Sequence, residues 1–176
     1  MTNHANIWAP WRMAYLRSQE EPGGTPAAGH RNFLQGYWQD PDSDEANLVV
    51  HRDRHGMILL NRYPYTNGHL LVALGQPAPK LGDYDPDQRA AFWNLIDLAG
   101  RLVHRTLNPQ GLNIGINEGS AAGAGVPEHL HGHVVPRWGG DTNFMTVVGA
   151  VRVAPDALES VAADYRAAIE RGLLEE

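Results

Sequence analysis

The stretch that decides the fold is residues 129–137, which read HLHGHVVPR. Imidazoles alternate here with apolar or small residues, a period of two that is typical of a β-strand, whose successive side chains point to opposite faces. His129, His131 and His133 are therefore expected on one face, while Leu130 and Val134 face a core. Neighbouring imidazoles each need hydrogen-bond partners, and each disfavours protonation of the next. The pattern therefore indicates chemistry more than packing.

Two kinds of chemistry fit these histidines. One is a metal site, because histidine is the commonest metal ligand. Such a site usually adds a carboxylate, and Glu128 would point to the opposite face. The other is nucleophilic and acid–base catalysis by neutral imidazole, which attacks phosphorus well at neutral pH. Residues 117–125, NEGSAAGAG, favour the second, since a glycine-rich loop can aim backbone N–H groups at a phosphate.

Composition narrows the function classes. The chain has 176 residues, 43% hydrophobic and 19% charged, which fits one domain with a sizeable core. Lys and Arg number 14 against 20 Asp and Glu, a net charge of -6, so neither nucleic acid nor a membrane surface is an expected partner. Residues 1–10 lack a signal core, and a cytoplasmic location is expected. Cysteine is absent, which excludes disulfides, thiolate zinc sites and cysteine nucleophiles.

The rest of the chain predicts a sheet with helices. Short apolar runs between turn residues predict five strands, at residues 48–50, 56–61, 69–74, 112–117 and 130–135. Residues 85–88, DPDQ, form a helix start, and an apolar stripe continues to about residue 107. A C-terminal helix is expected to open at Pro155, and residues 18–46 are predicted to form a long loop. Short connections favour an antiparallel sheet with helices on one face, an α+β fold.

The motif of residues 129–137 resembles the signature of the histidine triad (HIT) superfamily of nucleotide hydrolases and transferases. The resemblance extends over about residues 48–150. Residues 59–72 (LLNRYPYTNGHLLV) are similar to the strand–loop–strand segment of the family, and residues 117–119 (NEG) open a stretch similar to its phosphate loop.

Two further stretches narrow the resemblance to one branch. Residues 8–12 (WAPWR) and 133–144 (HVVPRWGGDTNF) are similar to the bacterial diadenosine tetraphosphate phosphorylase-like branch, which is related to Fhit-type hydrolases. The resemblance implies a HIT-like α+β fold, with an antiparallel sheet of about five strands and two main helices. It also implies a homodimer. A single HIT domain would then span residues 1–176, with an irregular extension at 1–46, a core at 47–150 and a C-terminal helix at 151–176.

The resemblance also assigns roles to residues. His131 would be the nucleophile that carries the nucleotidyl group, His133 would contact the phosphate or the scissile bridge, His129 would orient the cluster, and His69 would be the fourth histidine. Asn61 would bind ribose, and Leu59 and Leu71 would line the base pocket. The complete nucleotide-binding set would be Asn61, Leu59, Leu71, Asn117, Gly123, Ala124, Gly125 and Trp138.

Three positions depart from the family pattern. Gly132 stands where an apolar residue is usual, and a glycine inside a strand either costs packing or marks a close approach. Residues 125–127 (GVP) lack the Ser or Thr that assists the leaving group in many members. Some bacterial members carry a Cys-x-x-Cys zinc site, whereas the comparable residues 32–35 here are NFLQ, so no structural zinc is expected. The candidates to hold the N-terminal segment are instead aromatic: Trp8, Trp11, Phe33 and Trp38.

The resulting hypothesis is a nucleotide-binding enzyme that cleaves a nucleoside polyphosphate, such as diadenosine tetraphosphate, or a nucleotide conjugate. Cleavage would occur at the α-phosphate through a nucleotidyl-histidine, with water or phosphate as the acceptor. No cofactor is required, and a divalent cation such as Mg²⁺ would enter only as part of the substrate complex. Two alternatives stay open: a metal-dependent hydrolase with a histidine cluster, and a nucleotide-binding module without catalysis.

Overall fold

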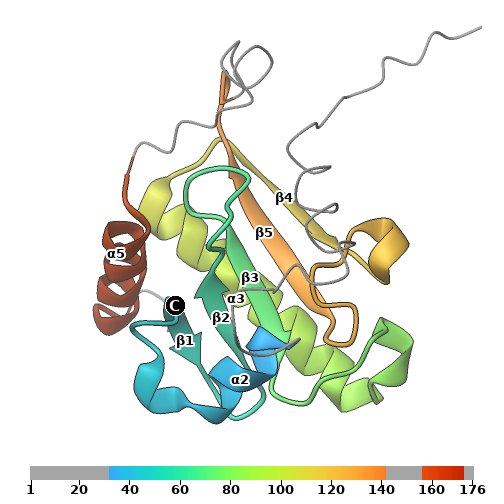
Figure 1. The fold of residues 1–176 in the computed structure, drawn as a ribbon. Coiled ribbons are helices and arrows are strands. Elements are labelled where there is room, and N and C mark those ends of the chain that lie inside the picture. Colours follow the sequence, from blue (N-terminus) through green and yellow to red (C-terminus); the bar gives the residue numbers. More distant parts are fainter. Residues whose placement is uncertain (1–31, 142–155, 173–176) are drawn as a thin grey trace, which may run out of the picture. The chain divides into compact units, whose positions relative to one another are not determined.

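The computed structural model describes residues 32–141 and 156–172, and these residues form an antiparallel sheet with helices around it (Figure 1). Among them the sheet has five strands in the order β1-β2-β3-β5-β4. The strands are β1 (Val49–Arg52), β2 (Gly56–Leu60), β3 (Leu70–Leu74), β4 (Gly111–Ile116) and β5 (His131–Arg137). The expected α+β fold is confirmed, and every predicted strand is present with each end shifted by at most two residues.

The strand register separates two apolar clusters on opposite faces of the sheet. Leu59 of β2 pairs with Leu71 of β3, which pairs with His133 of β5. Directly paired residues share a face, so the side chain of His133 lies on the same face as the two leucines. Alternate residues of the same strands, such as Val72, belong to the other cluster, together with Leu130 and Val134. The predicted inward direction of Leu130 and Val134 is confirmed.

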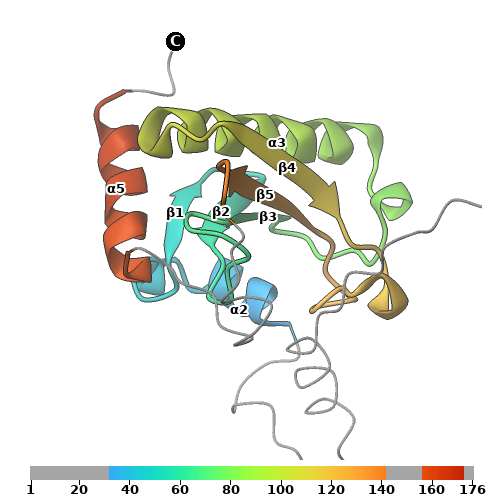
Figure 2. The ribbon, with the colours of Figure 1, turned by 90° about the horizontal axis from the view of Figure 1, so that it is seen from above.

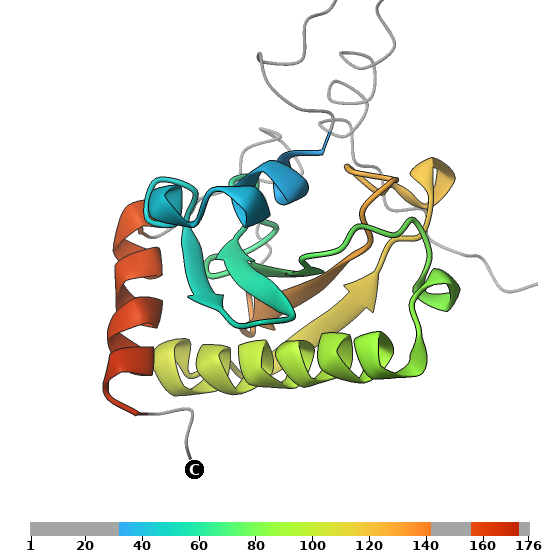
Figure 3. The ribbon, with the colours of Figure 1, turned by 90° about the horizontal axis from the view of Figure 1, so that it is seen from below.

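Helix α3 (Pro86–Leu107) covers one face of the sheet (Figures 2 and 3). The predicted capping box is present, because the side chains of Asp85 and Gln88 each accept from the other residue's backbone N–H. The apolar stripe of α3 is buried against the sheet. A Cβ on Gly132 would lie 2.9 Å from Cδ1 of Ile96, so this glycine marks a close approach of α3 rather than a loosened strand.

Helix α2 (Phe33–Gln39) lies on the opposite face and corrects the prediction of a long loop over residues 18–46 (Figure 3). A short 3₁₀ turn, η1 (Pro41–Ser43), follows it. A helix of seven residues is not stable alone, and tertiary contacts hold this one. The Asn32 side chain caps its N-terminus, the guanidinium of Arg52 donates to two carbonyls at its C-terminus, and Leu34 is fully buried.

Helix α5 (Leu158–Glu170) packs beside β1 and the end of α3 (Figure 1). It begins at Leu158, whereas the sequence predicted a start at Pro155, which lies outside the described residues together with Trp8 and Trp11. The hydroxyl of Tyr165 donates to the carbonyl of Gly68 at 2.8 Å, beside His69. No helix within residues 32–141 and 156–172 has the length and apolar character needed to cross a membrane.

Candidate active site

The site is built at the start of β5, on the sheet face opposite α3. His131 and His133 are paired with Ala73 and Leu71, so their rings share that face, as the alternation predicts. His129 precedes the strand, because the N–H of Leu130 donates to the carbonyl of Ala78 instead of entering the ladder. His69 lies directly before β3, and its ring reaches His133 with 3.0 Å between the nearest nitrogens.

The proton position on His131 follows from one hydrogen bond. Nδ1 of His131 lies 2.9 Å from the main-chain carbonyl oxygen of His129, which can only accept. Nδ1 therefore carries the proton, and Nε2 of the neutral ring keeps a lone pair. Burial lowers the pKa of His131 below the ordinary histidine value, since the ring is only 5% exposed. A neutral imidazole with a free pair on Nε2 is the form that acts as a nucleophile.

The proton position on His133 follows from a chain of contacts through His69. The backbone N–H of Tyr65 donates to Nδ1 of His69 at 3.1 Å, and the Asn61 amide nitrogen lies 3.2 Å from the same atom. Nδ1 of His69 is thus an acceptor, so the neutral ring carries its proton on Nε2 and donates it to Nδ1 of His133. Neutral His133 then carries its own proton on Nε2. In this arrangement Nε2 of His131 carries a lone pair and Nε2 of His133 carries a proton.

Tyr65 is a part of the site that the sequence did not single out. Its ring centroid lies 4.6 Å from that of His69 and 5.8 Å from that of His133, and it is nearly parallel to the second ring, at 13°. Stacked aromatic rings of this kind stabilise one another's orientation. The loop after Asn61 therefore positions both histidines, through the backbone of Tyr65 as well as through its ring.

An apolar row leads across the sheet to the histidines. Leu59 and Leu71 are 2% and 4% exposed and belong to the cluster that α2 covers. Phe33 and Tyr37 of α2 pack against this cluster and stack edge-on with 5.3 Å between ring centroids. The predicted base-pocket residues are thus side by side next to His133, with two aromatic rings that sequence reasoning placed in a loop.

The glycine-rich loop connects β4 to the start of β5, next to His131, and it contains the 3₁₀ turn η3 (Ser120–Ala122). Its backbone is folded on itself: the N–H groups of Gly123 and Ala124 donate to the carbonyls of Ser120 and Gly119. The donors that remain for a predicted phosphate cradle are therefore the N–H of Gly125 and the half-exposed side chain of Asn117.

Trp138 is not brought to the histidines within one chain. It follows the last residue of β5, whereas His131 is the first, and seven residues of strand span roughly 23 Å. Arg137, at the same end, forms an ion pair with Asp141 at 2.6 Å. Within the described residues of one chain, Trp138 therefore makes no contact with the apolar row of Leu59 and Leu71.

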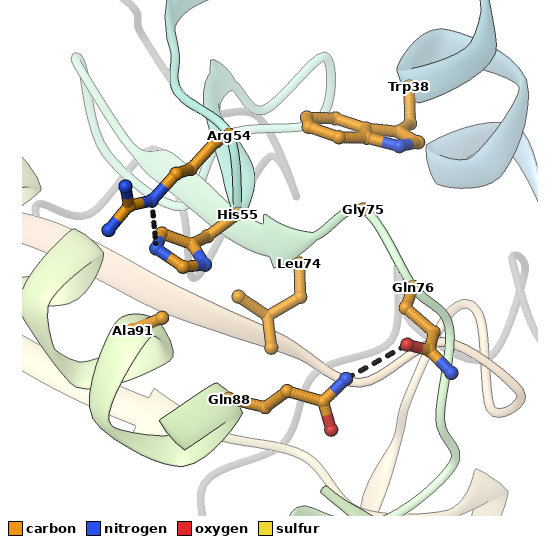
Figure 4. A pocket seen from close by; sticks show the side chains of 8 residues that line it. All are labelled: Trp38, Arg54, His55, Leu74, Gly75, Gln76, Gln88 and Ala91. Atoms are coloured by element: carbon orange, nitrogen blue, oxygen red, sulfur yellow. Dashed lines mark hydrogen bonds between the residues drawn. The ribbon is translucent and has the colours of Figure 1, made fainter. Parts of the chain in front are cut away.

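A cavity of about 330 Å³ is lined by none of the predicted site residues, although its lining residue Leu74 contacts His129 through its carbonyl (Figure 4). It is lined by Trp38, Arg54, His55, Leu74, Gly75, Gln76, Gln88 and Ala91. Its polar groups are paired with each other, Arg54 with His55 at 2.8 Å and Gln88 with Gln76 at 2.9 Å. Within residues 32–141 and 156–172, no three His, Asp or Glu side chains are grouped as a metal site.

Comparisons of the sequence and of the structure with known proteins indicate the same family. A sequence model of the HIT domain matches residues 43–140. The chain is 39% identical to an AP-4-A phosphorylase of Mycobacterium tuberculosis over 153 residues, which are 86% of this chain and 77% of that protein. It is 29% identical to the asymmetrical bis(5'-nucleosyl)-tetraphosphatase of Schizosaccharomyces pombe over 51% of this chain and 48% of that protein. A crystal structure of a Zn-bound histidine triad family protein from Mycobacterium smegmatis has a TM-score of 0.64 and 29% identity, covering 80% of this chain and 96% of that one.

Proposed function

Because the chain belongs to the HIT domain family, we propose that it is a nucleotidyl-transferring enzyme that cleaves a nucleoside polyphosphate, such as diadenosine tetraphosphate, or a nucleotide conjugate at the α-phosphate. The observation that carries the proposal is the proton arrangement: a lone pair on Nε2 of His131 beside an N–H on Nε2 of His133. Leu59 and Leu71 are themselves buried, so a nucleobase next to these atoms would meet the half-buried rings of Phe33 and Tyr37 that pack over the two leucines.

In the first step, Nε2 of His131 attacks the α-phosphorus, and the bond from that phosphorus to the bridging oxygen breaks. The polyphosphate leaves with the electron pair as an anion, and the Nε2–H of His133, whose position His69 fixes through its bond to Nδ1, donates a hydrogen bond to the departing oxygen. In the second step an acceptor oxygen attacks the nucleotidyl-histidine. The bond between phosphorus and Nε2 of His131 breaks and its electron pair returns to Nε2, while any proton on the acceptor oxygen passes to solvent.

We propose phosphate as the acceptor. Support comes from the 39% identity to a protein named a phosphorylase, which extends over most of both chains. Diadenosine tetraphosphate would then give ATP as the leaving group and ADP from the transferred adenylyl group. Water as the acceptor would give AMP in place of ADP. The remaining donors, the Gly125 N–H and Asn117, would hold the phosphates, and Asn61 the ribose.

The test is incubation with diadenosine tetraphosphate with and without inorganic phosphate, with products separated by chromatography. We expect ADP and ATP in phosphate, and the variant His131→Ala should lose at least about 1,000-fold in turnover while still binding adenine nucleotide. Full activity of His131→Ala would contradict the mechanism. Loss of activity on chelation, with a stoichiometric metal, would support the metal-dependent alternative, and binding without any cleavage would support the non-catalytic one.

The proposal includes a homodimer and a cytoplasmic location. The exposed edge strand β4, in which Asn113, Ile114 and Gly115 are accessible, supports self-association. The single-domain organisation over residues 1–176 likewise stays a prediction. Fractionation of cells that express the tagged chain would test the location.

A further inference from the structure

The side chain of His129 is fully buried, although the mechanism gives its ring no chemical step. Nε2 of this ring lies 2.7 Å from the carbonyl oxygen of Leu74, at the end of β3. Nδ1 lies 3.0 Å from the side-chain oxygen of Asn32. Both ring nitrogens are therefore held, one by the sheet and one by the residue that precedes α2.

Asn32 suits this place because its amide can serve two partners. Its oxygen also accepts the backbone N–H of Gln35 at 2.9 Å and so caps α2. The Leu74 carbonyl only accepts, so Nε2 of His129 carries a proton. With a second proton on Nδ1 the ring donates to the same Asn32 oxygen that caps α2. Without that proton the amide must turn so that its NH₂ group donates to Nδ1, and the Gln35 N–H then loses its acceptor. An amide can meet either form of the ring.

The His129 ring matters because the same residue supplies the carbonyl that sets the proton position on His131. The peptide group between residues 129 and 130 follows a loop rich in glycine, which contributes little rigidity of its own. Three contacts hold it: the bond from the His129 N–H to the Val126 carbonyl, the bond from the Leu130 N–H to the Ala78 carbonyl, and the His129 ring.

We propose that Asn32 is a positioning residue for the nucleophile: it fixes the ring of His129, whose carbonyl oxygen holds Nδ1–H of His131 and leaves Nε2 as the attacking atom. The same residue caps α2, which covers Leu59 and Leu71. The side chain of Asn32 thus helps to place both the nucleophile and helix α2. The inference rests on the proposed function for its kinetic consequence, but the proton position on His131 can be observed without turnover.

The central variant is Asn32→Ser in the full chain. Serine is as good a helix cap as asparagine, but its hydroxyl is one atom closer to the backbone and does not reach His129. We expect the thermal midpoint to stay near that of the wild type, while kcat for diadenosine tetraphosphate falls by about 10- to 100-fold, as for a misplaced reacting group. Loss is partial because the backbone bonds to Ala78 and Val126 remain.

A second readout is ¹⁵N NMR of histidine-labelled protein, which reports whether Nδ1 or Nε2 is protonated. The wild type should show His131 in the Nδ1–H form, and Asn32→Ser should show a mixture of the two forms. The control is Asp85→Ala, which removes a helix cap from α3 away from the histidines and should lower stability without changing either readout.

Three results would overturn the inference. They are a kcat of Asn32→Ser within twofold of the wild type, an unchanged His131 spectrum in that variant, and a loss of activity that merely follows the folded fraction. If the wild type cleaves no nucleoside polyphosphate, the proposed function fails, yet the NMR comparison still decides the role of Asn32.

Discussion

At the scale of single residues, the chemistry depends on which ring nitrogen carries a proton. The wild-type pH profile of kcat/KM tests this directly. Burial lowers the pKa of His131, so its neutral form persists below the ordinary histidine pKa of 6.5. We expect kcat/KM to stay level through neutral pH and to fall only with a midpoint below 6.5.

The same pKa shift has a consequence for stability. Unfolded His131 binds a proton at a higher pH than the folded form, so acidification favours the unfolded chain, progressively below pH 6.5. The control for the kinetic measurement is the exposed residue His104, at the end of α3. The variant His104→Ala should leave the pH profile of kcat/KM unchanged. A midpoint of kcat/KM at or above 6.5 in the wild type would contradict a buried neutral nucleophile.

Sequence reasoning reached the identity of the histidines but not their proton positions. Spacing of two within residues 129–137 was enough to place His131 and His133 on one face. Neither the carbonyl that fixes His131 nor the Tyr65 N–H that fixes His69 has a local signal, because each contact depends on where the backbone runs in three dimensions.

At the scale of elements, prediction succeeded where the local signal was strong. Helix α3 has a cap, a first-turn proline and an apolar stripe, and its observed start agrees with the sequence. Helix α2 contains Gly36 and lies in a segment rich in Pro, Asp and Ser, so its local sequence does not predict a helix. It exists because Asn32, Leu34 and Arg52 make contacts with the rest of the fold.

The contact between α3 and β5 gives a prediction at this scale. A Cβ on Gly132 would lie 2.9 Å from Cδ1 of Ile96 and 3.2 Å from Cζ of Phe92, and valine adds two more methyl groups. We expect Gly132→Val to lower the free energy of unfolding by about 1–3 kcal/mol, as overpacking does. Urea denaturation of the purified protein measures the loss.

Shortening the opposing side chain is the matched control. Ile96→Val removes Cδ1, the atom nearest to the new Cβ, and should recover part of the loss when combined with Gly132→Val. The double-mutant cycle should show a coupling of at least about 0.5 kcal/mol. Strictly additive effects would mean that α3 and β5 do not meet at this glycine.

At the scale of the whole molecule, the two edges of the sheet differ. The edge at β1 lies beside α5, and Arg166 of α5 donates to the carbonyl of Val49 at 3.2 Å. At the other edge, β4 pairs only with β5 among the described residues, and Ile114 is 49% exposed. An open strand edge with an accessible apolar side chain favours pairing with another strand.

We therefore expect two copies to associate through β4, related by a twofold axis that makes the strands antiparallel and extends one sheet across both chains. Light scattering coupled to gel filtration should give twice the mass of one chain. Ile114→Lys places a charge on this edge and should give a monomer whose helical signal is unchanged. Tyr63→Lys, at a side chain that is 81% exposed in the loop before His69, should stay dimeric. A monomeric wild type, or a dimeric Ile114→Lys protein, would show that β4 is not the contact.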